Sequence, residues 1–501
     1  MNFLDLLNGA EYLAQQGNPA IAGLDYDSRR VKPGWCFVAI RGETTDGNHF
    51  IDAALKAGAV AIVSDTLLPR ADVAWAHVTH GRRALARVSA NFYGRPAEKL
   101  FITGITGTNG KTTTSFLLQA MLRAGGRQAA LLGTIEYRIG DKVLPAPHTT
   151  PEALELNQAF ANALEVGCSE VAMEVSSHAL EQQRVYGVPF DVAVFTNLTR
   201  DHLDYHRTME NYFAEKTILF EGCGAEPPRA AVINVDDEYG RRLVKRCRKQ
   251  TELLKYGIDS GDFRAKDLSI EHAGVRFQIA MPHGEIPIWS PLLGRVNVYN
   301  LLAASAAAYA RNVEPEAVAG AAEHLARVTG RFERVDAGQP FTVIVDYAHT
   351  DDALRNLTAV ARDFLVQQGG RGGRVITVFG CGGDRDRSKR PLMGEAAGRG
   401  SDFVVLTSDN PRSEDPLDIM NDALPGLQRS GVRYTMESDR RKAIALAIEE
   451  AQPGDILLIA GKGHEKVQIT NAGATPFDDI EVARNALWKA GYGASQPAGK
   501  S

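Results

Sequence analysis

Cysteine is scarce in this chain of 501 residues, and the cysteines that are present form no pattern. They are odd in number, scattered, and without C-x-x-C spacing: Cys36, Cys168, Cys223, Cys247 and Cys381. Neither a disulfide framework nor a zinc site of thiolates is therefore indicated. We interpret each cysteine as a small core or surface residue.

Long hydrophobic runs and an excess of basic residues are absent as well. No apolar run approaches the ~18 residues of a membrane span, and Met1–Asp5 lacks the basic segment that opens a signal peptide. A formal net charge of −5 argues against a nucleic-acid partner, which normally leaves a basic excess. We therefore expect a cytosolic protein without a nucleic-acid or membrane partner, in which a local basic pocket would suffice for a small anionic ligand.

Length and local pattern indicate an α/β protein of three domains. A chain of this length corresponds to about three domains of ~150 residues each. Short β-like runs alternate with helical segments in three successive series, and we place the domains at residues 1–97, 98–331 and 332–490. The tail, residues 491–501, has too few apolar residues to offset the entropy of ordering, so we expect it to be flexible.

The most informative stretch is Gly104–Thr113, a glycine-rich turn between an apolar β-like run, Leu100–Thr103, and an amphipathic helix. Glycines allow backbone N–H groups to approach phosphate oxygens, Lys111 adds a charge, and the Thr112 hydroxyl can ligate Mg²⁺. Ile105 stands where the usual G-x-x-x-x-G-K-[ST] pattern has glycine, so the pattern is the narrower G-x-x-G-x-x-G-K-T. An ordinary glycine-containing turn is the weaker interpretation.

Polar residues follow later β-like runs of the same domain. Glu174 ends the run that starts at Val171, where a carboxylate could hold the Mg²⁺ of a bound nucleotide or could simply be solvated. The segment Asn197–His206 is rich in histidine and aspartate, so one of its histidines could ligate a metal, although no spacing typical of zinc accompanies it. By spacing alone, Lys216 has a buried stem and a tip that reaches solvent.

Four β-like runs in the last third are each followed by polar, glycine-rich or charged residues. The runs are Thr342–Val345, Val375–Phe379, Phe403–Leu406 and Ile456–Ile459. The polar segments that follow them, in the same order, are residues 346–350, 380–386, 408–412 and 461–465. Because ligands bind outside the carboxyl ends of strands in open parallel sheets, we expect these segments to converge on one edge.

In combination, these segments resemble the ATP-dependent Mur ligases of bacterial peptidoglycan synthesis. The resemblance extends from about residue 24 to about residue 490 and is carried by Gly104–Thr113, Met173–His178, Asn197–His206, Gly294–Asn300, Gly330–Arg331, Asp346–Thr350 and the later polar segments. Within that family, Asp409–Arg412 resembles the signature of the member that adds meso-diaminopimelate to UDP-N-acetylmuramoyl-L-alanyl-D-glutamate.

The resemblance implies an N-terminal UDP-binding domain, a central P-loop ATPase domain and a C-terminal Rossmann-like domain for the amino acid. It assigns ATP to Gly107, Thr108, Asn109, Gly110, Lys111, Thr112, Thr113, Asn297, Asn300, Arg331 and Asp346. It assigns the UDP-muramoyl-dipeptide to Tyr26, Ser28, Glu43, Thr44, Thr45, His148, Thr149, Thr150, Ser176, Gln182 and Arg184. It assigns diaminopimelate to Arg385, Asp409, Asn410, Pro411, Arg412, Gly461 and Glu465.

The resemblance also implies a mechanism. The ATP γ-phosphoryl group would pass to the D-Glu carboxylate, and the amine of diaminopimelate would attack the acyl phosphate. The implied catalytic residues are Lys111, Glu174, His202 and Lys216, and the implied Mg²⁺ ligands are Thr112, Glu174, His202 and Lys216. Lys216 would act as a carbamate, N6-carboxylysine, whose formation needs a neutral amine and hence a lowered pKa. All partners would be small molecules, and we expect a monomer.

Other interpretations remain open at this point. A related ligase could add L-lysine, although Arg385 and Arg412 argue against it because lysine has no distal carboxylate. A folylpolyglutamate synthetase has a related architecture. A P-loop switch or transport ATPase could bind a regulator at the C-terminal loops, but the sequence contains no N-K-x-D guanine motif. ATP hydrolysis that depends on both the UDP-dipeptide and the amine would separate the classes.

Overall fold

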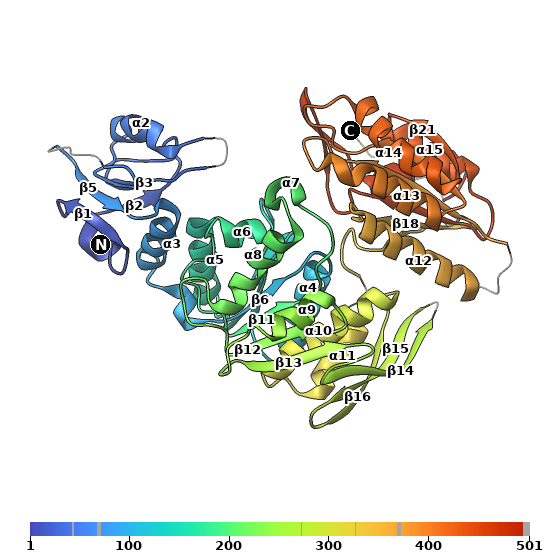
Figure 1. Ribbon diagram of the computed structural model, residues 1–501, viewed down its shortest axis with the longest axis horizontal. Coiled ribbons are helices and arrows are strands. Elements are labelled where there is room, and N and C mark those ends of the chain that lie inside the picture. The colour runs from blue at the N-terminus through green and yellow to red at the C-terminus, as the bar shows by residue number, and fades with distance from the viewer. Residues whose placement is uncertain (43–44, 68–71, 272, 326, 368–371, 494–501) are drawn as a thin grey trace.

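In this computed structural model the chain forms three α/β domains, each built around its own large sheet (Figure 1). The structure describes residues 1–42, 45–67, 72–271, 273–325, 327–367 and 372–493. The central domain, green to yellow, lies between the blue N-terminal domain and the orange-to-red C-terminal domain (Figure 1). The three-domain α/β prediction is therefore confirmed. Within the described part of the chain, no helix is long and apolar enough to cross a membrane.

The N-terminal sheet has the strand order β1-β5-β4-β3-β2. Its strands are β1 Tyr12–Gln16, β2 Gly23–Asp25, β3 Trp35–Ala39, β4 Ala61–Ser64 and β5 Ala74–Val78. Its helices are α1 Phe3–Leu6, α2 Ile51–Lys56 and α3 Gly81–Phe92. Strands β3 and β4 are almost wholly buried, as is typical of parallel strands covered by helices on both faces.

The central sheet has eleven strands in the order β16-β15-β14-β13-β12-β11-β6-β10-β7-β8-β9. They are β6 Phe101–Thr106, β7 Ala129–Leu132, β8 Glu136–Ile139, β9 Lys142–Pro145, β10 Glu170–Glu174, β11 Val192–Phe195, β12 Ala230–Asn234, β13 Glu252–Gly257, β14 Phe263–Glu271, β15 Gly274–Met281 and β16 Gly284–Ser290. The strands from β7 to β14 in this order run parallel, and antiparallel pairing with β8 and β9 at one end and with β15 and β16 at the other extends the sheet.

The helices of the central domain position the strand ends. They are α4 Lys111–Ala124, α5 Ala153–Glu165, α6 Ser177–Glu181, α7 Leu203–His206, α8 Met209–Glu221, α9 Glu238–Val244, α10 Arg295–Ala310 and α11 Pro315–His324. The alanine-rich helix α10 packs closely against α4, because its small side chains are buried at the contact. The helix that carries Lys111 is thereby fixed within the core.

The C-terminal sheet has the order β17-β18-β22-β19-β20-β21, with only β17 antiparallel to its neighbour. Its strands are β17 Glu333–Val335, β18 Thr342–Asp346, β19 Val375–Cys381, β20 Phe403–Ser408, β21 Arg433–Glu437 and β22 Ile456–Ala460, and a hairpin follows, β23 Val467–Thr470 and β24 Gly473–Pro476. Helices α12 Asp351–Gln367, α13 Arg390–Gly400 and α14 Pro416–Ser430 cover one face, and α15 Arg440–Glu450 and α16 Asp479–Lys489 the other.

The four polar segments of the C-terminal domain converge as expected, because β18, β22, β19 and β20 are parallel neighbours. We propose domain boundaries near residues 97 and 331, since β6 and β17 open the second and third sheets shortly afterwards. Tyr492 packs edge-on against Phe341, with 5.6 Å between ring centroids. Of the tail expected to be flexible, residues 494–501 lie outside the described residues. All five cysteines are free.

Candidate active site

The phosphate loop connects β6 to α4 through two glycines that leave no room for a side chain. Gly107 has a φ of +147°, and a Cβ there would lie 1.9 Å from Thr196 Oγ1. Gly110 has a φ of +86°, and its Cβ would lie 2.5 Å from Asn300 Oδ1. Only glycine fits both positions. The loop therefore leads the backbone directly onto the N-terminus of α4, which favours bound phosphate.

Hydrogen bonds from neighbouring segments hold the loop in this shape. The Thr108 and Asn109 amides donate to the backbone and side-chain oxygens of Asn197, at 2.8 and 2.9 Å. Asn300 Nδ2 donates to Asn297 Oδ1 at 3.0 Å, which brings together two asparagines expected to contact ATP.

Two lysine side chains converge on one carbonyl of this loop. Lys111 Nζ donates to Gly107 O at 3.0 Å, and Lys216 Nζ donates to the same oxygen at 2.9 Å. Lys216 is 1% exposed, so the interpretation from spacing alone, a tip that reaches solvent, is wrong. Burial lowers the pKa of both amines, and the neighbouring Lys111 lowers that of Lys216 further, to well below its ordinary range. The site thus favours a neutral amine at Lys216.

Glu174 is fully buried at the end of β10 and is not a solvated strand-end residue. It accepts hydrogen bonds from the Thr134 amide at 2.7 Å, the Thr134 hydroxyl at 2.9 Å and the Thr112 hydroxyl at 3.1 Å. Arg331 Nη2 also donates to Thr112 Oγ1, at 3.2 Å. A carboxylate beside a hydroxyl is an oxygen donor set that suits Mg²⁺.

Protein side chains alone do not complete a metal cage here. Among the residues that the structure describes, no three His, Cys, Asp or Glu side chains gather in an arrangement that could hold a metal ion. This fits Mg²⁺ bound through one or two protein ligands with phosphate oxygens and water, which is its usual mode at nucleotides.

A cavity of about 320 Å³ lies beside the loop, between the central and C-terminal domains. Seven of the residues expected to contact ATP line it: Asn109, Gly110, Thr113, Asn297, Asn300, Arg331 and Asp346. Arg331 stacks over the Tyr347 ring, 4.6 Å from its centroid. Asp346 accepts from the Phe332 and Ala348 amides at 2.7 and 2.8 Å, and burial raises its pKa. The rest of the wall combines apolar side chains, including Tyr256 and Leu292, with polar ones such as Asn234.

A second cavity, of about 160 Å³, lies where the four C-terminal strands end. The loops after these strands contribute Tyr347, His349, Gly380, Gly382, Arg385, Lys389, Asp409, Asn410, Arg412, Gly461 and Glu465, and the central domain adds Asp201, His202 and Asp204. Of the residues expected to bind diaminopimelate, only Pro411 is not part of this lining. Its carbonyl instead packs against Gly383, where a Cβ would lie 1.9 Å away.

Arg412 adopts a strained backbone conformation at this cavity. Its φ of +54° lies in the left-handed region, which non-glycine residues rarely occupy, and His202 on the opposite domain shares this value. Arg412 Nη1 donates to Gly383 O at 2.6 Å, and burial together with Arg385 lowers its pKa. Strained residues concentrate at functional sites, so the backbone conformations of Arg412 and His202 support the interpretation of this cavity as a functional site.

Asp201 connects the two domains across the cavity. Its carboxylate lies 3.3 Å from His202 Nε2, 3.5 Å from Lys389 Nζ and 3.8 Å from His349 Nε2. Burial would raise the pKa of Asp201, but these three neighbours more than offset that effect and hold it well below its usual range. Burial also lowers the pKa of His202 to about 3, so this imidazole is neutral near pH 7.

Part of the set expected to bind the UDP-muramoyl-dipeptide forms one network around Thr150. Thr150 Oγ1 donates to Glu174 O at 2.9 Å and accepts from the Ser176 amide at 3.1 Å. Arg184 donates to Thr150 O at 3.0 Å and to Gln182 Oε1 at 2.7 Å. This network therefore reaches the backbone of Glu174.

His148 and Thr149 extend this network. The hydroxyl oxygens of Thr149 and Thr134 lie 3.1 Å apart, and Tyr137 OH donates to His148 O at 2.6 Å.

The N-terminal residues expected to bind the UDP-muramoyl-dipeptide make fewer contacts with the rest of the site. Tyr26 OH donates to Glu155 Oε1 on α5 at 3.1 Å. Ser28 is half-buried and Thr45 exposed, and among the described residues no contact joins these two to the Thr150 network. Glu43 and Thr44 lie outside the described residues.

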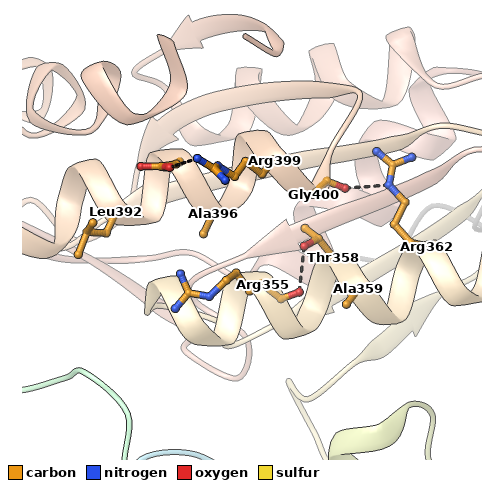
Figure 2. Close-up of a pocket in the computed structure, with 9 residues that line it drawn as sticks. Arg355, Thr358, Ala359, Arg362, Leu392, Ala396, Arg399 and Gly400 are labelled. Atoms are coloured by element: carbon orange, nitrogen blue, oxygen red, sulfur yellow. Dashed lines mark hydrogen bonds and ion pairs between the residues drawn. The ribbon is translucent and has the colours of Figure 1, made fainter. Parts of the chain in front are cut away.

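A third hollow, of about 440 Å³, lies between α12 and α13 and shares no lining residue with the two cavities above (Figure 2). Three arginines line it, but each is paired with a carboxylate: Arg355 with Asp351, Arg362 with Asp402 and Arg399 with Glu395. We assign this hollow no role.

Comparison with known proteins accounts for this arrangement. Three family models match the chain: Mur ligase family, catalytic domain, at residues 20–93; Mur ligase middle domain at 105–308; and Mur ligase, glutamate ligase domain, at 330–463. A protein of Solibacter usitatus, named UDP-N-acetylmuramoyl-L-alanyl-D-glutamate--2,6-diaminopimelate ligase, is 55% identical over 479 residues and 95% of each chain. The chain belongs to the Mur ligase family.

Other relatives agree with this membership. A Geobacter metallireducens protein of the same name is 48% identical, with 93% of this Mur ligase and 94% of that protein covered. A solved structure, also titled with this name, is 35% identical, has a TM-score of 0.67 and covers 98% and 99% of the two chains. MurF ligase from Thermotoga maritima, solved with ADP, is 20% identical with a TM-score of 0.63 and 93% and 97% covered, and it shares the fold.

Sequence reasoning missed several residues that this Mur ligase places at the site. Asp201 lies within the segment Asn197–His206, where its position before two histidines was an available signal. Lys389 follows the polar segment after β19 and is buried. Thr134 and Asp352 gave no sequence signal, because their roles depend on long-range contacts with Glu174 and Asn109.

Proposed function

We propose that this Mur ligase joins meso-diaminopimelate to UDP-N-acetylmuramoyl-L-alanyl-D-glutamate with consumption of ATP. The observation that carries the proposal is the 160 Å³ cavity, in which Arg385 and Arg412 share one small space with Asp409 and Glu465. Two cations and two anions complement an amino-acid centre that carries both a carboxylate and an ammonium. The relatives that bear this activity in their names support the same substrate pair.

Phosphoryl transfer would occur at the N-terminus of α4. A carboxylate does not condense with an amine in water, so the γ-phosphoryl group passes from ATP to the D-Glu carboxylate, which gives ADP and an acyl phosphate. Lys111 offsets the charge that opposes the approach of two anions. The amine then attacks the acyl carbon, inorganic phosphate leaves, and the nitrogen loses a proton to form the amide.

Lys216 is proposed to work as a carbamate. The neutral amine that burial favours can add to CO₂ with loss of a proton, which turns a potential cation into an anion. We propose that Glu174 and the Thr112 hydroxyl would hold one Mg²⁺ together with phosphate oxygens, and that the carbamate and the neutral His202 imidazole would support a second Mg²⁺. Mg²⁺ supplies charge neutralisation at the transferring phosphoryl group.

Contact between the domains would protect the intermediate. The Asp201 cluster joins the central domain to Lys389 and His349 of the C-terminal domain beside the amino-acid cavity. Excluding water there favours attack by the amine over hydrolysis of the acyl phosphate. We further propose that the protein acts in the cytoplasm as a monomer, since its substrates are small soluble molecules.

Ligation assays with the full-length protein test the proposal. ATP, Mg²⁺ and the UDP-dipeptide are combined with meso-diaminopimelate or L-lysine, and the product mass is read by mass spectrometry. We expect the diaminopimelate adduct and release of phosphate only when the dipeptide and the amino acid are both present. A preference for L-lysine would contradict the substrate assignment, and ATP hydrolysis independent of both substrates would favour a switch ATPase.

A further inference from the structure

Lys462 lies beneath the amino-acid cavity and has no exposed surface. Its Nζ donates to Asn410 Oδ1 at 2.9 Å and to Glu465 Oε2 at 3.3 Å, and it lies 3.5 Å from Asp409 Oδ1. Asn410 and Glu465 therefore use two of the three donors of the ammonium, whereas among the described residues Asp409 Oδ1 has no hydrogen-bond partner and pairs with Lys462 by charge alone. All three line the cavity, whereas Lys462 itself does not.

The ammonium also determines which way the Asn410 amide points. Asn410 Oδ1 accepts from Lys462 and from the Ile469 amide at 2.9 Å, and its Nδ2 donates to Glu465 Oε2 at 2.7 Å. A flipped amide would place its NH₂ group against two donors and its oxygen against a carboxylate. One oxygen of Glu465 is therefore held by both Lys462 and Asn410.

The strand ends on either side of these residues are separately anchored. Arg440 is buried, pairs with Asp479 at 2.7 Å, and donates to Ala460 O at 2.9 Å and Ser408 O at 3.3 Å. Arg440 thus joins the ends of β20 and β22 through their backbones. Lys462 instead contacts the side chains of Asp409, Asn410 and Glu465, which line the cavity.

We infer that Lys462 is a positioning residue that sets the stereospecificity of the amino-acid site, an inference that rests on the proposed function. It holds the two carboxylates at fixed places relative to Arg385 and Arg412. Distinguishing the two configurations of one carbon requires several contacts with fixed relative positions. Without the ammonium, Asp409 and Glu465 repel each other and the Asn410 side-chain oxygen keeps only the Ile469 amide of its described donors, so the contacts remain but their relative positions are less fixed.

Steady-state kinetics of the full-length enzyme with meso- and LL-diaminopimelate test this inference. Lys462→Met removes the charge and the donors, and Lys462→Gln removes the charge but keeps an amide NH₂ group. Lys466→Met is the matched control, because this lysine lies four residues away, is 55% exposed and pairs with Asp478. We expect both Lys462 variants to lower the meso-to-LL ratio of kcat/KM at least about tenfold, since truncating one partner of a buried pair has effects of that order. The control should keep the parent ratio.

The individual kcat and KM values distinguish a positioning role of Lys462 from a general loss of structure. The KM for diaminopimelate should rise while kcat and the KM values for ATP and the UDP-dipeptide stay within about threefold of the parent. The inference is overturned if the variants keep the parent's isomer preference, if all KM values rise together, or if neither variant folds, because Lys462 would then be structural. A parent enzyme that ligates neither isomer would contradict the proposed function itself.

Discussion

Burial of Lys216 beside Lys111 has a consequence for stability. Because burial lowers the folded-state pKa of Lys216, the unfolded chain binds a proton that the folded chain does not. Folding therefore becomes less favourable as pH falls from the ordinary lysine range toward the folded pKa. We expect Lys216→Met to raise the free energy of unfolding by at least about 1 kcal/mol at pH 7 in CO₂-free buffer, and by less at pH 9. Denaturant unfolding at both pH values measures this, and an equal gain at both would contradict it.

The same lysine should be indispensable for turnover. Lys216→Ala is expected to lower kcat at least about a hundredfold, because no carbamate can form to support the metal. Added acetate or bicarbonate should restore part of the activity by occupying the space left by the side chain. Lys245→Ala, at an exposed lysine, is the control. A fully active Lys216→Ala enzyme would remove this residue from the mechanism.

Arg412 should determine which amino acid is joined. Loss of one partner of a buried charge pair typically costs ~2–5 kcal/mol, so Arg412→Ala should raise the KM for diaminopimelate by orders of magnitude. The KM values for ATP and the UDP-dipeptide should change little. Arg429→Ala, at an exposed arginine paired with Glu395, controls for loss of positive charge. Unchanged use of diaminopimelate by Arg412→Ala would refute the role.

At the scale of elements, the two ends of α4 offer a direct test of the phosphate loop. Gly107 and Gly126 flank this helix and both have positive φ, but only Gly107 lacks space, because Gly126 has no atom within 4 Å of its Cβ position. Gly126→Ala should cost about 1 kcal/mol of stability and keep activity. Gly107→Ala should lose ATP-dependent ligation while the rest of the domain unfolds normally. Ligation assays and thermal unfolding compare the two variants. Equal ligation activities would show that the phosphate loop tolerates a side chain at residue 107.

The sequence predicted the elements around this loop better than the contacts between them. Strands β18, β19, β20 and β22 begin at the residues where their runs were expected to begin, and their ends meet as the parallel-sheet rule requires. Local pattern could not place the Lys216 tip, since its acceptor, Gly107 O, lies far away in the chain. The same holds for Asp201, whose partners Lys389 and His349 belong to another domain. Such contacts depend on how the domains pack against each other. The spacing of apolar residues within one helix or strand carries no information about that packing.

At the scale of the whole molecule, the central and C-terminal domains meet through few polar side chains. Asn109 in the phosphate loop donates through Nδ2 to Asp352 Oδ2 on α12 at 2.9 Å. Arg200 Nη2 donates to Ser388 Oγ at 2.7 Å, and Asp201 faces Lys389 nearby. Residues of both domains line the 320 Å³ cavity beside the phosphate loop, so we expect these bonds to couple the arrangement of the domains to ATP binding.

Breaking the bond between Asn109 and Asp352 tests this coupling. Asp352→Ala should raise the KM for ATP about tenfold, because a hydrogen bond to a charged group contributes ~1.5–3 kcal/mol. Asp363→Ala, an exposed aspartate on the same helix, should leave KM unchanged. In the double variant with Asn109→Ala the effects should fall short of additivity by at least ~0.5 kcal/mol, since both substitutions remove one shared contact. Strict additivity would mean that each residue acts on ATP independently, and the bond between the domains would then have no part in nucleotide binding.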